Sequence, residues 1–75
     1  MKLKNILATF PNFDWFIEDM KDTCHCVWGY DLENKAYMAF EHKGNGKYVI
    51  IAVETWTKQE IEQRYKYDNK RYRIL

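Results

Sequence analysis

Two cysteines and two histidines near the middle of the 75-residue chain could bind a metal ion. Cys24, His25 and Cys26 are consecutive, and His42 follows further along the chain. Thiolates and imidazoles are the usual ligands of structural zinc, so Cys24, Cys26 and His42 form a candidate zinc site. Zinc cysteines are commonly separated by two or more residues, however, and a strand would turn His25 away from both thiols. We therefore expect no metal or other cofactor, with both thiols buried as small apolar side chains.

The same side chains could supply a nucleophile, if His42 removed the proton of Cys24 across two neighbouring strands. A reactive thiolate needs a lowered pKa and access to solvent, and the sequence offers no third group that would orient the imidazole. The chain contains no serine, which excludes a serine nucleophile. The sequence therefore predicts a protein that is not an enzyme, and a zinc- or thiol-dependent protein is the third hypothesis.

Residues 57–75 combine positive charge with aromatic rings. Six basic residues outnumber three acidic ones in this segment, whereas the whole chain has a net charge of only +1. The cations and tyrosines that alternate here are Arg64, Lys66, Lys70, Arg71 and Arg73, and Tyr65, Tyr67 and Tyr72. Cations that contact phosphates and rings that stack on bases are typical of single-strand nucleic-acid binding. A nucleic-acid-binding or regulatory protein is therefore the alternative hypothesis, although Glu60, Glu62 and Asp68 dilute the positive charge.

The first part of the chain has the apolar spacing of helices. Two sets of residues follow the i, i+3, i+4, i+7 pattern of one helix face: Leu3, Ile6, Leu7 and Phe10, and then Phe13, Phe16, Ile17 and Met20. Pro11 suits the first turn of a helix, where its missing N–H needs no partner. We predict a helix over 11–22, preceded at 2–9 by a short helix or an irregular lead-in.

Three β-strands follow in the prediction, because residues that favour strands alternate between turn signals over 24–31, 36–42 and 47–54. Asn45-Gly46 is a strong cue for a two-residue hairpin turn. This turn would place Met38 opposite Val53 and Phe40 opposite Ile51 in an antiparallel pair.

A three-residue loop before the second strand would place Trp28 opposite Met38. Trp28, Phe40 and Ile51 would then share one inner face, which both helices cover. The outer face would be a flat strip of small residues bordered by two tyrosines: Val27, Gly29, Ala39, Ala52 and Ile50, with Tyr37 and Tyr48.

The end of the chain has a clear helix start. Thr57 and Glu60 form a capping box, and Trp56 and Ile61 have the spacing of a hydrophobic staple. We predict a helix over 58–68 and, at 72–75, a possible short strand. The predicted fold is a small α+β single domain over 1–75, with an N-terminal helix, a three-stranded antiparallel β-meander and a C-terminal helix.

The bulk composition excludes several classes of protein. Aromatic residues make up 17% of the chain and apolar residues 47%, which is typical of a folded domain rather than a disordered tail. No apolar run reaches the roughly 20 residues that span a membrane. The chain also lacks the pattern of a signal peptide, and cysteines one residue apart form a disulfide poorly, so we expect a cytoplasmic protein without membrane contact.

Several side chains have no place in the predicted core and are typical of protein interfaces: Trp15, Tyr37, Tyr48, Ile50, Tyr67 and Tyr72. We predict that they bind a protein partner, with a homodimer through the sheet face or edge as one form of this. The leading hypothesis is a non-catalytic protein-binding module that occludes or bridges its partner. A small inhibitor of the kind that phages and mobile elements encode, for example an anti-CRISPR-like inhibitor of a defence nuclease, fits that class.

Overall fold

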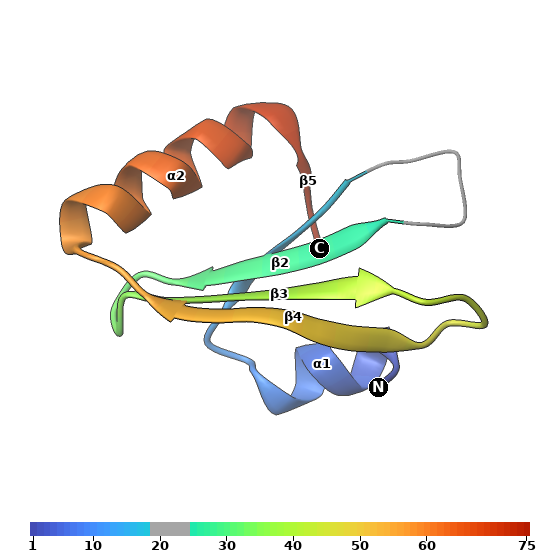
Figure 1. Ribbon diagram of the computed structural model, residues 1–75. Helices are drawn as coiled ribbons and strands as arrows, with labels where there is room; N and C mark the ends of the chain where they lie inside the picture. The colour runs from blue at the N-terminus through green and yellow to red at the C-terminus, as the bar shows by residue number, and fades with distance from the viewer. Residues whose placement is uncertain (19–24) are drawn as a thin grey trace.

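The computed structural model describes residues 1–18 and 25–75. Its elements are, in order, α1 (Leu3–Thr9), β1 (Asp14–Ile17), β2 (Cys26–Asp31), β3 (Ala36–His42), β4 (Tyr48–Thr55), α2 (Lys58–Arg71) and β5 (Arg73–Ile74). The strands pair antiparallel in the order β4-β3-β2-β1-β5, with α1 on one face of the sheet and α2 on the other (Figure 1). The predicted α+β fold is confirmed, including the antiparallel meander β2-β3-β4, the C-terminal helix and the short C-terminal strand; the sheet has five strands, and the N-terminal helix lies at Leu3–Thr9.

The prediction of a helix over 11–22 is wrong where the structure describes that segment. Asp14–Ile17 is a strand between β2 and β5, and 19–22 lie outside the described residues. Trp15 and Phe16 are adjacent and both buried, at 3% and 0% exposure, because they point to opposite faces of the sheet. A strand covered on both faces has no alternating polar residues. Its apolar residues can therefore match helix spacing by coincidence.

The sheet has a hydrophobic core on each face. The core under α1 contains Ile6, Trp15, Val27, Met38, Phe40 and Tyr48, and the core under α2 contains Phe16, Tyr30 and Ile61. The expectation that both helices cover one face is therefore wrong. Because one helix packs on each face of the sheet, this short chain can bury aromatic rings on both faces of the same strands.

The register between β2 and β3 explains the difference. Trp28 lies opposite Ala39, one residue away from the predicted partner, so Trp28 and Phe40 point to opposite faces. The cause is a longer turn. Asp31 is buried, and its carboxylate accepts hydrogen bonds from the backbone and side-chain N–H groups of Asn34, at 3.2 and 2.8 Å.

The predicted register between β3 and β4 is correct for half of the pair. Met38 lies opposite Val53, as expected, but a β-bulge between Ala39 and Phe40 then places Phe40 opposite Ile50 rather than Ile51. The loop is longer than the predicted two residues, because Gly44, Asn45 and Gly46 all have positive φ. The predicted strip of small residues is absent, since Val27, Gly29 and Ile50 share the α1 face while Ala39 and Ala52 share the α2 face.

The second helix begins as predicted. The Thr57 Oγ1 accepts a hydrogen bond from the Glu60 backbone N–H at 3.2 Å, and Ile61 is fully buried against the sheet. The helix continues to Arg71, beyond the predicted end at 68, and leads directly into β5. Neither helix of the described residues has the length and apolar character needed to cross a membrane.

Gly29 in β2 tests the packing under α1. A Cβ at this position would lie 2.7–2.9 Å from ring atoms Cε3, Cδ2 and Cζ3 of Trp15. We expect Gly29→Ala to lower the free energy of unfolding by about 1–3 kcal/mol, measured by urea denaturation. The same substitution in a Trp15→Phe background should cost much less, because the clash is with the larger ring. An unchanged urea midpoint in Gly29→Ala alone would contradict this packing.

Candidate functional site

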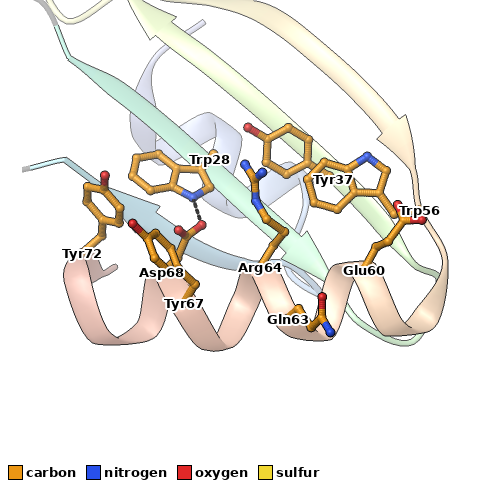
Figure 2. Close-up of a pocket in the computed structure, with 9 residues that line it drawn as sticks. All are labelled: Trp28, Tyr37, Trp56, Glu60, Gln63, Arg64, Tyr67, Asp68 and Tyr72. Carbon is orange, nitrogen blue, oxygen red and sulfur yellow. Dashed lines mark hydrogen bonds between the residues drawn. The ribbon is translucent and has the colours of Figure 1, made fainter.

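A groove of about 740 Å³ lies between α2 and the sheet. Figure 2 shows the nine side chains that line it, five of which are aromatic: Trp28, Tyr37, Trp56, Glu60, Gln63, Arg64, Tyr67, Asp68 and Tyr72. The structure thus brings together three residues predicted to bind a protein partner, Tyr37, Tyr67 and Tyr72, with Arg64 from the predicted basic segment.

Asp68 anchors α2 to the sheet at the floor of this groove. The side chain is 5% exposed, and its Oδ2 accepts one hydrogen bond from the Trp28 indole N–H at 2.7 Å and another from the Tyr30 hydroxyl at 2.5 Å. Burial raises the pKa of Tyr30, and the hydrogen bond to Asp68 adds to this effect, so the phenol keeps its proton and donates it. This role was not predicted from the sequence, where Asp68 counts among the acids that dilute the positive charge of residues 57–75. The available signal was its position on the helix face of Ile61 and Tyr65.

Arg64 crosses the groove one turn before Asp68. The interaction with the nearby Tyr30 hydroxyl raises the pKa of Arg64. The Cζ atom lies 5.3 Å from the centroid of the Trp56 ring, within the range of a cation–π contact. Figure 2 shows the side chain extending between Trp28 and Tyr37. The charged group therefore lies beside a buried tyrosine and an aromatic face.

Aromatic pairs border the guanidinium on both sides. Tyr37 and Trp56 stack with 4.7 Å between ring centroids and 16° between planes, and Trp28 meets Tyr72 edge to face at 4.7 Å. Further along α2, the Arg71 Cζ lies 4.9 Å from the ring centroid of Tyr67. Lys66 and Lys70 are exposed on the same helix, whereas Arg73 lies in β5 opposite Ile17. Four of the five predicted nucleic-acid-binding cations are therefore on α2.

A second surface lies at the other end of the sheet, on the edge strand β4. Four aliphatic side chains of this strand are about half exposed or more: Val49 at 48%, Ile50 at 47%, Ile51 at 52% and Val53 at 66%. Met1 exchanges two hydrogen bonds with Tyr48, at 3.0 and 2.7 Å, and Lys2 bridges to Lys47. Among residues 1–18 and 25–75, nothing pairs with the outer edge of β4 beyond Tyr48.

Two residues predicted to bind a partner are not on the surface. Trp15 is 3% exposed, packs over Gly29, and its indole N–H donates to the Phe10 carbonyl at 3.3 Å. Tyr48 is 6% exposed and belongs to the core under α1. The predicted exposure was wrong for both, because the helix assignment misplaced Trp15 and the bulge turned Tyr48 inward. Ile50 is exposed, as the prediction assumed.

The candidate metal ligands are not assembled in the part of the chain that the structure describes. Cys24 lies outside it, Cys26 faces α2 opposite Glu41, and His42 faces α1. The one-residue register difference therefore separates Cys26 from His42. No cluster of three or more metal-ligating side chains occurs among the described residues. Burial, with Glu41 and Glu18 nearby, raises the pKa of the Cys26 thiol, which disfavours a nucleophilic thiolate.

The two histidines instead form a stacked pair at the end of the sheet. The His25 and His42 ring centroids are 4.7 Å apart with 14° between planes, and His25 Nε2 lies 2.6 Å from the Tyr48 hydroxyl oxygen. Burial and the charge that His42 can carry lower the pKa of His25.

The chain matches no protein-family model, and comparison with curated proteins and with solved structures finds no significant similarity. Function is therefore inferred from the geometry and chemistry of the two surfaces alone.

Asp68→Asn tests the anchor of α2. The amide removes the negative charge that two donors share, so we expect the free energy of unfolding to fall by about 1–3 kcal/mol in urea denaturation. Glu62→Gln makes a similar chemical change at an exposed position of the same helix and should shift stability by less than about 0.5 kcal/mol. Equal effects of the two substitutions would contradict the anchoring role.

The histidine pair predicts a loss of stability in mild acid. The folded-state pKa of His25 lies below the unfolded value of about 6.5. The unfolded state therefore binds the proton first, and the free energy of unfolding falls as pH decreases through 6.5. In His25→Phe, which keeps an aromatic ring without the titrating group, urea midpoints measured between about pH 7.5 and 5.5 should fall less steeply. Parallel profiles would show that His25 does not carry this dependence.

Proposed function

We propose that this protein is a non-catalytic protein-binding module that pairs with another chain through the open edge of β4. The observation that carries the proposal is the row of half-exposed aliphatic side chains at Val49, Ile50, Ile51 and Val53. Val49 lies on the α2 face and Ile50 and Val53 on the α1 face, so β4 exposes aliphatic side chains on both faces along its edge. Single exposed apolar residues are ordinary on a protein surface, but several along one edge strand are typical of an interface.

The backbone of β4 supports the same conclusion. An edge strand presents N–H and C=O groups that another strand can pair with. Natural proteins usually shield such edges with lysines, prolines or short strands, yet β4 has eight residues and Glu54 is its only charged side chain. Completing the burial of each half-exposed aliphatic side chain would contribute about 1 kcal/mol, in addition to the strand hydrogen bonds. This mode of recognition is strand addition to an exposed sheet edge.

A second copy of this chain is the occupant that we propose first. An antiparallel pair of β4 strands related by a two-fold axis at Ala52 would place Ile51 of each copy opposite Val53 of the other. Ile51 and Val53 would then meet aliphatic partners on either side of Ala52, whereas Ile50 would lie opposite Glu54 and Val49 opposite Thr55. The small net charge of +1 gives little repulsion between copies.

The narrower hypothesis concerns biological role. A binding module of 75 residues could act in the cytoplasm as an inhibitor that occludes or bridges its partner, as phage- and mobile-element-encoded inhibitors such as anti-CRISPR-like proteins do. Its small size and the row of exposed aliphatic side chains on β4 support this hypothesis.

Ile51→Lys tests the edge. Ile51 is 52% exposed, so a lysine can reach solvent in the monomer but would place a charge in the paired state. We expect wild-type protein to reach twice its 9.2 kDa mass with rising concentration in size-exclusion light scattering, and Ile51→Lys to remain at 9.2 kDa. Gln59→Lys adds the same charge on the exposed side of α2 and should behave as wild type.

Two results would contradict the proposal. Wild-type protein that remains monomeric up to about millimolar concentration would exclude pairing with a second copy. A different protein partner captured equally well by wild type and by Ile51→Lys would exclude β4 as the binding edge for that partner.

A further inference from the structure

We propose that the groove between α2 and the sheet binds single-stranded nucleic acid, with bases stacked on its aromatic rings and phosphates on Arg64 and the neighbouring Arg71. This site is distinct from the exposed aliphatic side chains of β4, none of which lines the groove; α2 and its groove lie over one face of the sheet (Figure 1). The inference rests on the shape of the groove, the position of Arg64 and the distribution of charge along α2.

Tyr67 is the most exposed ring of the groove, at 53%, with Arg71 over one of its faces. Trp28, Tyr37, Trp56 and Tyr72 are partly exposed along the groove, and contacts with Phe16, with one another and with Arg64 cover part of their surface. Aromatic side chains with accessible faces stack on unpaired bases, whatever the base, and this is the main attraction in many single-strand binding sites. The volume of about 740 Å³ is within the range of sites that hold a small organic ligand.

Arg64 supplies a positioned cation among these rings. The guanidinium lies near the Tyr30 hydroxyl, which donates a hydrogen bond to Asp68, and near the Asp68 carboxylate itself; both interactions raise the pKa of Arg64. Arg64 forms no salt bridge with any residue that the structure describes. A guanidinium has five N–H donors, and these can form a fork that matches a phosphate.

The charge along α2 favours a polyanion on the half of the helix that follows Arg64. From Arg64 to Arg71 the helix has four cations, with Lys66 and Lys70 between them, and one acid. That acid is Asp68, whose carboxylate is buried and engaged with Trp28 and Tyr30. The exposed charges of this half are therefore positive. Arg64 lines the groove and Arg71 packs on Tyr67 beside it, whereas Lys66 and Lys70 lie on the side of the helix that faces away from the sheet. The exposed acids of the helix, Glu60 and Glu62, precede Arg64, and Glu60 also lines the groove.

The aromatic lining distinguishes between polyanions. An acidic peptide would use the cations but has no need of five rings in one groove. A nucleic-acid duplex presents its phosphates but keeps its bases stacked on one another, away from side-chain rings. Unpaired bases alone would use both features together.

Fluorescence anisotropy with a labelled oligothymidylate of about 12 nucleotides tests this inference. Wild-type protein should bind at about 50 mM salt, with affinity that falls linearly in a log–log plot against salt concentration. Tyr67→Ala should weaken binding by about 5- to 100-fold, because one stacking surface is lost. Tyr67→Phe keeps the ring and should bind as wild type, which separates stacking from loss of fold.

A pair of charge variants tests the position of the cations. Arg71→Gln should weaken binding several-fold and reduce the slope of the salt dependence by about 1, because Arg71 lies beside Tyr67 of the groove. Lys58→Gln removes one positive charge about 20 Å away on the same helix and should change neither. Ile51→Lys, on β4, should also leave oligonucleotide binding unchanged, so failure of this inference and failure of the β4 proposal can be told apart.

Three results would overturn the inference. The first is no binding of the oligonucleotide at about 50 mM salt. The second is equal affinity for poly-glutamate of similar charge together with an unaffected Tyr67→Ala variant, which would indicate an electrostatic surface for acidic proteins. The third is equal or tighter binding of a duplex of the same length, which would exclude recognition of unpaired bases.

Discussion

The buried carboxylate of Asp68 is the interaction on which the α2 side of this protein depends. It receives hydrogen bonds from Trp28 and Tyr30, which come from the sheet, and thereby fixes the angle and height of the helix above them. A buried carboxylate is costly unless hydrogen bonds compensate for lost water, so the two donors and the acid stabilise one another. The Tyr30 hydroxyl also lies near Arg64 and raises its pKa. Trp28, Asp68 and Arg64 all line the groove, so the helix-to-sheet anchor is part of its wall.

The sheet separates two cores and two surfaces. Adjacent residues such as Trp15 and Phe16 are both buried because α1 covers one face and α2 the other. The helices cover the middle of the sheet but not its edge at β4, where Val49, Ile50, Ile51 and Val53 are about half exposed or more. Aromatic residues therefore serve the cores and the groove, while aliphatic residues form the open edge. The protein-binding proposal and the nucleic-acid inference concern different ends of one small fold.

Local signals predicted part of this structure. The start of α2 was predictable because Thr57 and Glu60 act through contacts within one helical turn. The position of β1 was not, because the spacing from Phe13 to Ile17 fits one helix face as well as a strand buried on both sides. The register between β2 and β3 was not predictable either, because Asp31 binds Asn34 in a turn that is one residue longer than expected and that places Trp28 and Phe40 on opposite faces of the sheet. The groove could not be predicted from the sequence, because Trp28 and Asp68 lie far apart in the chain and meet only when α2 packs on the sheet.

The most direct test of this account follows the three indole N–H signals by NMR during titration with an oligothymidylate of about 12 nucleotides. Trp28 and Trp56 line the groove, and Trp15 is buried on the opposite face as an internal reference. The account predicts saturable shifts of the Trp28 and Trp56 signals with the Trp15 signal unmoved. Shifts of Trp15 as large as the others, or no shift of any indole at saturation, would contradict it.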